Sequence, residues 1–384
     1  MPSGVRRMIR RGPRPLLLHL ALASLRSVTA FSPASMPWSG GLPIWNALLA
    51  QLPPAPAADP GLPAELIAGV AAYRRHPWHR DLVEPPVVWA EGESRVLDYG
   101  GTGVPVLFVP SLVNRAYVLD LAEGQSMMRF LAGRHRVLLL DWGWPGEAER
   151  GFSLTDYIAG RLERALAAVG QPVVLAGYCM GGLLCLGAAQ RRPEMVRGLA
   201  LLATPWDFHA VEAEAARGLA RLLPLLAPMM GVTDRLPIDA IQTLFAMLDP
   251  WGIGGKYARF ERVDPDSDRA RQFVAIEDWL NDGVPLAAAV ARECIGGWYG
   301  ANSPALGKWR VAGEAVAPGG LRVPAFVAVP GRDRIVPPES ARPLAALIPG
   351  AVLHSPAAGH VGMVAGGRAE LVLWRPLSEW IGAL

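Results

Sequence analysis

Cysteine is scarce in this chain of 384 residues, which has three, at positions 179, 185 and 294. The count is odd, and the spacings include neither a CxxC pair nor a Cys/His ligand pattern. These features argue against a disulfide framework and against a zinc site, and they favour a reducing compartment. Cys185 lies in an apolar stretch just after Cys179, and we expect Cys185 and Cys294 to be core residues.

Lysine is scarcer still, since Lys256 and Lys308 are the only two. The formal net charge is +3, and arginine supplies almost all of the positive charge. The arginines are scattered along the sequence and do not form one basic stretch interleaved with aromatic residues. The composition therefore does not predict nucleic-acid binding.

Long apolar runs are also missing. The best candidate, LLLHLALASL after the basic RRMIRRGPRP, is too short for a bilayer, which needs roughly 20 predominantly apolar residues. The order of basic, apolar and small residues resembles a secretory signal, but His19 and Arg26 interrupt it. We therefore favour an interfacial or partner-binding helix over a cleaved signal.

Composition changes along the chain suggest its organisation. Residues 1–60 are predicted to form an N-terminal tail that ends in the Pro/Ala linker QLPPAPAADPGLPAE. After it, almost entirely apolar strand candidates alternate with helix candidates, which predicts a parallel sheet covered by helices on both faces. The strand candidates are VPVLFVPS, HRVLLLDW, QPVVLAGY, MVRGLALLAT and RVPAFVAVPG.

A long stretch separates the last two of these strands. Residues 209–322 are more than a single crossover needs, and we interpret them as an inserted helical cap or lid. Aromatic residues are frequent here, and they could line an acyl-binding cleft or form the core of the cap. For any one of these residues we favour a place in the core of the cap. The two parts of the main domain would then be 61–208 and 323–384.

The most informative motif is GYCMGG, residues 177–182, which joins an apolar strand candidate to the helix-like LLCLGAAQ. Small residues around a nucleophile allow the strained strand-to-helix turn of the GxSxG nucleophile elbow. The residue in the nucleophile's place is Cys179, and the parallel sheet with this elbow predicts an α/β-hydrolase fold. A thiolate is a strong nucleophile and a reasonable leaving group, so the pattern favours exchange of one acyl thioester for another.

Two downstream residues complete a predicted triad. In this fold the acid and the histidine follow the nucleophile in that order, and Asp333 in GRDRIVPP and His360 in AAGHVG fit. Cys179 would attack, His360 would take its proton, and Asp333 would hold the imidazole tautomer and stabilise its charge. For the oxyanion we predict the backbone N–H groups of Met180 and of Val113, with Leu112 as the rival of Val113.

Several separate motifs, in the same order, resemble polyhydroxyalkanoate synthases. They are VPSLVNRAYVLDL, LLLDWGWP, GYCMGG, EDWLNDGVPL, and the terminal GRDRIVPP and GHVG. The resemblance covers roughly residues 60–384, and the length resembles that of the short catalytic subunits of two-component synthases. Residues in these motifs are our candidates for the substrate cleft: Asn114, Tyr178, Trp279, Asn281 and Asp282.

The resemblance implies an acyltransferase that polymerises (R)-3-hydroxyacyl-CoA, releases CoA and carries the acyl group on Cys179. No separate cofactor is implied, because CoA enters as part of the substrate. The implied partners are the growing polyester, a second copy of the chain and a second synthase subunit. The implied location is cytoplasmic, with the surface of a polyester granule as a further candidate site.

Two other classes of function remain open. A cysteine hydrolase such as dienelactone hydrolase shares GYCMGG and the Cys/Asp/His order, and a thioesterase or a polyester depolymerase would belong to the same class. The long insertion and EDWLNDGVPL favour the synthase, because small hydrolases lack such additions. The second class is a granule-associated or scaffold protein without turnover, against which the intact Cys179, Asp333 and His360 set argues.

Overall fold

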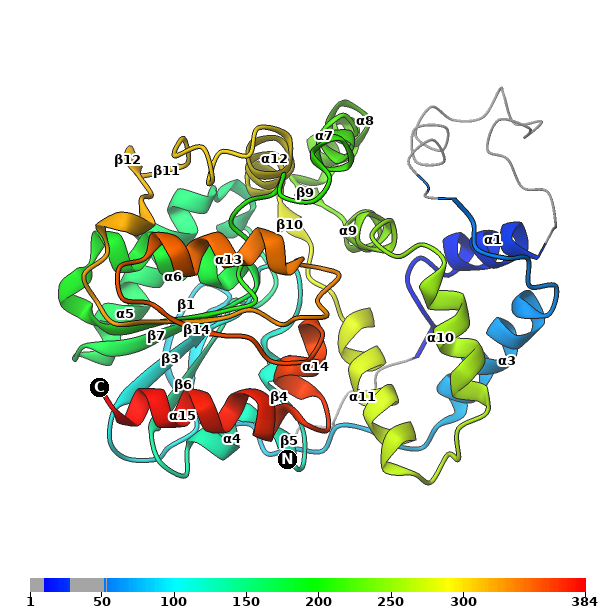
Figure 1. The fold of residues 1–384 in the computed structure, drawn as a ribbon, viewed down its shortest axis with the longest axis horizontal. Coiled ribbons are helices and arrows are strands. Elements are labelled where there is room, and N and C mark those ends of the chain that lie inside the picture. The colour runs from blue at the N-terminus through cyan, green and yellow to red at the C-terminus, as the bar shows by residue number, and fades with distance from the viewer. Residues whose placement is uncertain (1–9, 28–51, 53) are drawn as a thin grey trace. The chain divides into compact units, whose positions relative to one another are not determined.

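The computed structural model describes residues 10–27, 52 and 54–384. Within them the chain divides into two compact units (Figure 1). The sheet unit comprises residues 83–237 and 284–384, and the helical unit comprises residues 1–82 and 238–283. Each unit is therefore built from two separate stretches of the chain.

The sheet unit is built on an eight-stranded sheet in the order β1-β2-β6-β3-β7-β8-β13-β14. The strands β1 and β2 are antiparallel to their neighbours, and every pairing from β6 to β14 is parallel. The central strands are buried on both faces, which explains their almost purely apolar sequences. The strands are β1 Val87–Glu91, β2 Ser94–Asp98, β3 Pro105–Val109, β6 Arg136–Asp141, β7 Val173–Tyr178, β8 Val196–Leu202, β13 Ala325–Ala328 and β14 Val352–His354.

Helices cover both sides of this sheet. In Figure 1, α4 (Met127–Leu131) and α15 (Arg375–Gly382) lie along one side. On the other side lie α5 (Glu163–Val169), α6 (Met180–Arg191) and α13 (Pro338–Leu347). The predicted α/β-hydrolase architecture is thus confirmed.

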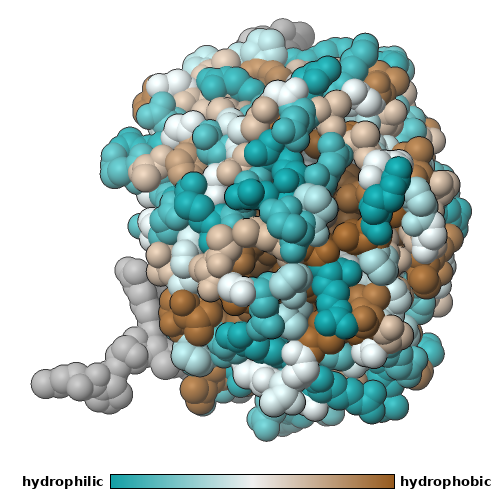
Figure 2. All heavy atoms as spheres, turned by 90° about the vertical axis from the view of Figure 1, so that its left-hand side faces the viewer, coloured by the Kyte–Doolittle hydropathy of each residue, from teal (hydrophilic) through white to brown (hydrophobic). Residues whose placement is uncertain are grey.

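Further helices and short strands of the sheet unit lie within or beside the predicted cap. They are α7 Ala213–Ala220, α8 Leu223–Thr233, β9 Arg235–Leu236, β10 Leu286–Ala287, α12 Ala288–Arg292 and η6 Glu293–Gly300. The short α14, His360–Ala365, follows β14. On the side of the molecule that faces left in Figure 1, hydrophobic patches are broken up by hydrophilic side chains (Figure 2).

The helical unit has a core of its own. Its helices are α1 Leu16–Arg26, α3 Leu62–Arg75, α9 Ile238–Ala246, α10 Gly252–Glu261 and α11 Asp268–Asn281. In the core, Tyr257 of α10 meets Tyr73 of α3 edge to face, with ring centroids 5.7 Å apart. Asp278 of α11 accepts hydrogen bonds from the Tyr73 hydroxyl and from the Arg10 guanidinium, at 2.7 Å each. The first and last parts of this unit are therefore fastened together by a buried polar contact.

The two units differ from the segments predicted from composition. Residues 209–237 and 284–322 group with the sheet unit, and only 238–283 of the predicted cap belongs to the helical unit. The predicted tail is also part of a folded unit, because α1 buries Leu18, Leu22 and Ala23 within the helical unit. The predicted linker is interrupted as well, since α3 begins at Leu62. Residues 28–51 and 53 of the predicted tail and linker lie outside the described residues.

No helix in the described part of the chain is both long enough and apolar enough to cross a membrane.

Candidate active site

Cys179 lies at the turn between β7 and α6, at the carboxyl edge of the parallel strands. Its backbone has φ 57° and ψ −127°, a conformation that costs energy for a residue with a side chain. The turn is held because the Cys179 N–H donates to the Leu202 carbonyl at 2.8 Å, and the Cys179 carbonyl accepts from Gly182 N–H at 3.0 Å. Cys179 is partly exposed, so the turn presents its side chain to the surroundings.

At two positions of the GYCMGG motif, neighbouring backbone atoms lie so close that only glycine fits. A Cβ on Gly177 would lie 2.4 Å from the Gly182 Cα, and one on Gly181 would lie 2.1 Å from the Val109 carbonyl oxygen. Both distances are well below any ordinary van der Waals contact. The strand, the turn and the start of α6 therefore pack together only with glycine at these positions.

His360 and Asp333 lie next to each other, as the sequence predicted. The Nδ1 of His360 and the Oδ2 of Asp333 are 2.6 Å apart, and both residues are buried. The other carboxylate oxygen of Asp333 accepts from the N–H groups of Ile335 and Val336, each at 2.9 Å. The Asp333 carboxylate is thus held in place by two backbone N–H groups. Because a carboxylate only accepts hydrogen bonds, Nδ1 of the His360 imidazole carries the proton.

The charges around His360 set its protonation. Cys179 is close enough to His360 to raise the pKa of its imidazole, and Asp333 bonds its Nδ1, so the three predicted residues are brought together. Burial lowers the pKa of His360, but the nearby Cys179 and the hydrogen bond with Asp333 raise it to about 10 overall. This site therefore favours an imidazolium between a sulfur and a carboxylate.

Tyr178 supports the histidine from the strand. Its hydroxyl donates to the His360 carbonyl at 3.2 Å, and the two rings lie 5.1 Å apart, tilted by 34°. Burial, Cys179 and Asp333 together raise the pKa of Tyr178 well above its ordinary value. Tyr178 therefore acts as a neutral donor that positions His360, and its phenol is already occupied by a protein partner.

The candidate oxyanion donors lie at the start of α6 and in the loop after β3. Met180 is the first residue of α6, and N–H groups in the first helical turn have no partner inside the helix. In the other loop, Val113 N–H makes a long contact of 3.4 Å with the Ser111 hydroxyl, and the Val113 carbonyl accepts from Val284 N–H at 3.1 Å. The indole of Trp142 donates to the Pro110 carbonyl at 3.0 Å and holds the start of this loop.

One residue near the nucleophile was missed as a site candidate. Tyr299 of η6 interacts electrostatically with Cys179, and burial, Cys179 and Cys294 raise its pKa. Its carbonyl lies 2.7 Å from the Nε2 of His209, and its ring meets Phe208 edge to face at 4.9 Å. Only the aromatic richness of the predicted cap pointed to it, and that signal does not single out one residue.

The predicted substrate-cleft residues fall in both units. Asn114 lies in the loop after β3, and its buried Oδ1 has no hydrogen-bond partner among the described residues. Trp279, Asn281 and Asp282 belong to the helical unit, where Trp279 is buried and the Asn281 side chain donates to the Glu277 carbonyl at 2.7 Å. A role of these residues in binding substrate stays a prediction.

The remaining cysteines are buried in the sheet unit, as expected. Burial raises the pKa of Cys185 well above its ordinary value, and burial with the nearby Glu293 does the same for Cys294. Neither has the exposed, electropositive surroundings of a reactive thiol. Among the described residues, no group of three or more His, Cys, Asp or Glu side chains could hold a metal ion.

Comparison with known proteins adds to this geometry. Residues 104–226 match the family model for the alpha/beta hydrolase fold. A poly(3-hydroxyalkanoate) polymerase subunit PhaC from Haloferax mediterranei is 29% identical over 309 residues, covering 77% of this chain and 63% of that protein. A protein of the same name from Allochromatium vinosum is 28% identical over 288 residues, covering 72% of this chain and 80% of that protein. This chain is therefore similar to poly(3-hydroxyalkanoate) polymerase subunits over about three quarters of its length.

A solved structure is also similar to this chain. It is a thermophilic esterase from Thermogutta terrifontis, 21% identical, with a TM-score of 0.43 and covering 78% of this chain and 98% of the esterase. The chain spans less than two thirds of the length of the Haloferax relative. The match therefore does not assign the activity of that whole protein to this chain.

Proposed function

We propose that this chain polymerises (R)-3-hydroxyacyl-CoA into a polyester and releases CoA, using Cys179, His360 and Asp333 as its catalytic triad. The observation that carries the proposal is the meeting of a strained cysteine elbow with the buried His360–Asp333 pair. The similarity to poly(3-hydroxyalkanoate) polymerase subunits, whose names give the product, supports the choice of reaction.

In the first step the Cys179 sulfur attacks the carbonyl carbon of the acyl-CoA thioester. The thiol proton is already held on Nε2 of the His360 imidazolium, so Cys179 attacks as a thiolate, and the carbon–sulfur bond to CoA breaks as the new bond to Cys179 forms. His360 then returns the proton to the departing CoA thiolate. One thioester replaces another, so the step is nearly balanced in energy and the acyl group stays activated.

In the second step the 3-hydroxyl of another acyl unit attacks the acyl group on Cys179. His360 accepts the hydroxyl proton, the oxygen–carbon ester bond forms, and the thiol of Cys179 is regenerated. In both steps negative charge develops on the carbonyl oxygen. The N–H groups of Met180 and Val113 would stabilise this charge, an effect for which one donor is commonly worth about 10²–10³ in kcat.

Asp333 has a fixed role in this scheme. Its Oδ2 holds Nδ1–H of His360, so the Nε2 atom is directed at the nucleophile and the imidazolium is stabilised. The two backbone N–H groups on Oδ1 keep the carboxylate in place while the charge on His360 changes.

The test supplies purified protein with (R)-3-hydroxybutyryl-CoA and follows free CoA and high-mass polyester together. We expect both products from the wild type, neither from Cys179→Ala, and wild-type rates from Cys185→Ala, which serves as the cysteine control. Release of CoA with only free hydroxy acid would replace the proposal with a cysteine hydrolase, in which water attacks the acyl group. Polymer formed by Cys179→Ala would refute the assigned nucleophile.

Partners belong to the same proposal. The relatives are called subunits, which supports the expectation of a second synthase chain, and we also propose a homodimer and contact with the polyester surface. Light scattering of the purified chain tests for the homodimer, and sedimentation of the protein with polyester particles tests for contact with the polyester surface. An active protein that is strictly monomeric would contradict the homodimer. A protein that stays in the supernatant would contradict contact with the polyester surface.

A further inference from the structure

A short two-stranded ribbon connects the sheet unit with the inserted part of the helical unit. The chain leaves the sheet unit after Pro237, directly beyond β9, and re-enters it at Val284, two residues before β10. In the ribbon, Leu236 pairs with Leu286 and Arg235 with Ala287. Two-residue strands are not stable by themselves, so the position of this β9–β10 ribbon depends on what holds it.

One anchor of the ribbon is Arg235. Its Nη2 donates to the Gly146 carbonyl at 3.2 Å, in the loop that follows β6. The Nε of Arg235 is buried and has no partner among the described residues. Within the part of the chain that the structure describes, the hydrogen bond to the Gly146 carbonyl is therefore the one that fixes the Arg235 side chain.

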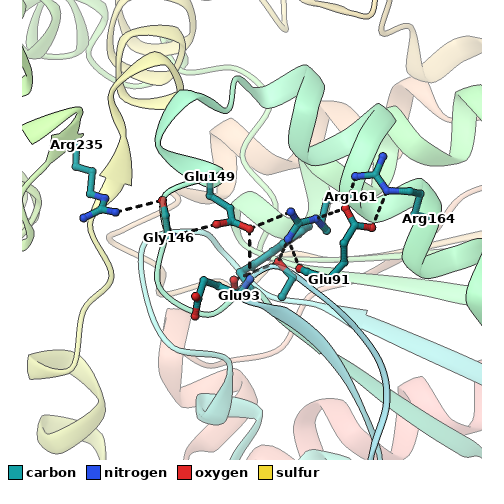
Figure 3. Close-up of polar contacts among 9 residues, drawn as sticks. Glu91, Glu93, Gly146, Glu149, Arg161, Arg164 and Arg235 are labelled. Carbon is teal, nitrogen blue, oxygen red and sulfur yellow. Dashed lines mark hydrogen bonds and ion pairs between the residues drawn. The ribbon is translucent and has the colours of Figure 1, made fainter.

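The loop that carries Gly146 is itself held by a buried ion pair. Glu149 accepts from Gly146 N–H at 3.0 Å and from the Arg161 guanidinium at 2.9 Å, and Figure 3 shows it between these two residues. The side chains of Glu149 and Arg161 are only 2% and 3% exposed. Arg161 also donates to Ser94 at 3.0 Å and lies 5.2 Å from the centre of the Phe152 ring. Gly146 is thus a rigid point of attachment.

A second anchor of the ribbon is the loop after β3, which carries a proposed oxyanion donor. Val284 N–H donates to the Val113 carbonyl at 3.1 Å. The same loop is held at its start by Trp142, which lies at the beginning of the Gly146 loop and donates to the Pro110 carbonyl. The residues 110–113 are therefore held from both ends, by Trp142 on one side and by the ribbon on the other.

We infer that Arg235 is a positioning residue for catalysis, which acts through the ribbon and Val284 to hold the Val113 peptide in place. The inference rests on the proposed function, in which Val113 N–H stabilises the oxyanion. If Arg235 loses its bond to Gly146, the ribbon can shift and Val113 shifts with it. Acyl transfer to Cys179 would slow, because stabilisation of an oxyanion depends strongly on donor position.

The experiment compares two reactions of Cys179 that differ in their need for an oxyanion donor. Acylation by p-nitrophenyl butyrate passes through an oxyanion, whereas alkylation by iodoacetamide displaces iodide and does not. For Arg235→Met we expect kcat of acylation to fall about 10- to 100-fold, with KM and the alkylation rate within about 2-fold of wild type. Arg235→Lys, which keeps a donor for the Gly146 carbonyl, should recover most of the lost rate.

Arg221→Met is the matched control, because Arg221 of the sheet unit is exposed and its ion pair among the described residues is with the exposed Glu214, at 2.7 Å. It should leave both reactions unchanged. Unchanged acylation in Arg235→Met would overturn the inference, and so would an equal loss of acylation and alkylation, which would mean general damage to the site.

A measurement on the wild type keeps the inference testable if Arg235→Met does not fold. Hydrogen exchange should show the Val284 and Leu236 amides protected to a degree comparable with the edge strands of the sheet, and exchange at unprotected rates would refute the anchoring. A wild type that is acylated by the nitrophenyl ester but releases no CoA from hydroxyacyl-CoA would overturn the proposed substrate alone. The comparison of Arg235 variants would still stand.

Discussion

Replacing Gly181 with alanine is the sharpest test of how the elbow positions Cys179. An added Cβ would lie 2.1 Å from the Val109 carbonyl oxygen and 2.7 Å from that of Pro110. A carbon–oxygen contact normally needs about 3.3 Å, so the start of α6 would have to move by about 1 Å. Both obstacles are backbone atoms next to or within a buried strand and cannot turn aside as a side chain could.

Gly181→Ala is expected to lower both the stability of the protein and the rate of acylation of Cys179. Overpacking of this kind typically destabilises a protein by about 1–3 kcal/mol, which urea unfolding at neutral pH would measure. A displacement of about 1 Å at the nucleophile can lower the reaction rate about 100-fold, which the burst of p-nitrophenol from the ester would measure. The rate effect should exceed what the loss of stability explains, because the folded fraction stays close to one.

Gly187 on the same helix provides the matched control. A Cβ there would meet the side chains of Ile158, at 3.3 Å, and Val311, at 3.5 Å, and alanine is favoured over glycine inside a helix by about 0.5–1 kcal/mol. Gly187→Ala should therefore stay within about 1 kcal/mol of wild type and keep its acylation rate. Wild-type acylation in Gly181→Ala, or an equal loss in both variants, would refute the account of the elbow.

Two further predictions concern charged pairs. The pKa of His360 is about 10 against an ordinary 6.5, so the stabilisation it gives is complete below pH 6.5 and is lost as the pH rises toward 10. The difference in unfolding free energy between wild type and His360→Gln should shrink over that range, and a constant difference would contradict the pairing. For the buried Glu149–Arg161 pair, removing the charge of Arg161 should cost about 3–5 kcal/mol, because Glu149 is left buried without a counter-charge. Removing the charge of Glu149 should cost less, because Arg161 still pairs with Glu91 at 3.2 Å. The double variant Glu149→Gln with Arg161→Met should cost less than the two single losses combined in thermal unfolding, and simple additivity would argue against the pair.

The sequence predicted those parts of the molecule that depend on local patterns. Buried parallel strands require continuous apolar runs, so β3, β6, β7, β8 and β13 were identified directly. The elbow was found because a close turn demands small residues on both sides of Cys179. Asp333 and His360 followed from their order after that turn, and the structure places them 2.6 Å apart.

What the sequence did not predict depends on contacts between distant parts of the chain. Composition placed the first 60 residues outside the folded domain, whereas α1 packs with α3 and α10, which only a three-dimensional arrangement can reveal. Tyr299 was one of many aromatic residues in the predicted cap, and nothing local marks the one near Cys179. The β9–β10 ribbon has strands of two residues, too short to give any periodic signal.

The division of the helical unit between two distant stretches of the chain has a consequence for synthesis on the ribosome. Tyr73 of α3 packs against Tyr257 of α10, and Arg10 pairs with Asp278, more than 200 residues later. At about 5–20 residues per second, α1 and α3 wait roughly 10–40 s before their partners emerge. During that interval the sheet unit is still being translated, and the apolar sides of α1 and α3 are open to chaperones and to other nascent chains. Translation speed should therefore influence the yield of this protein more than that of a hydrolase whose helices pack on neighbouring strands.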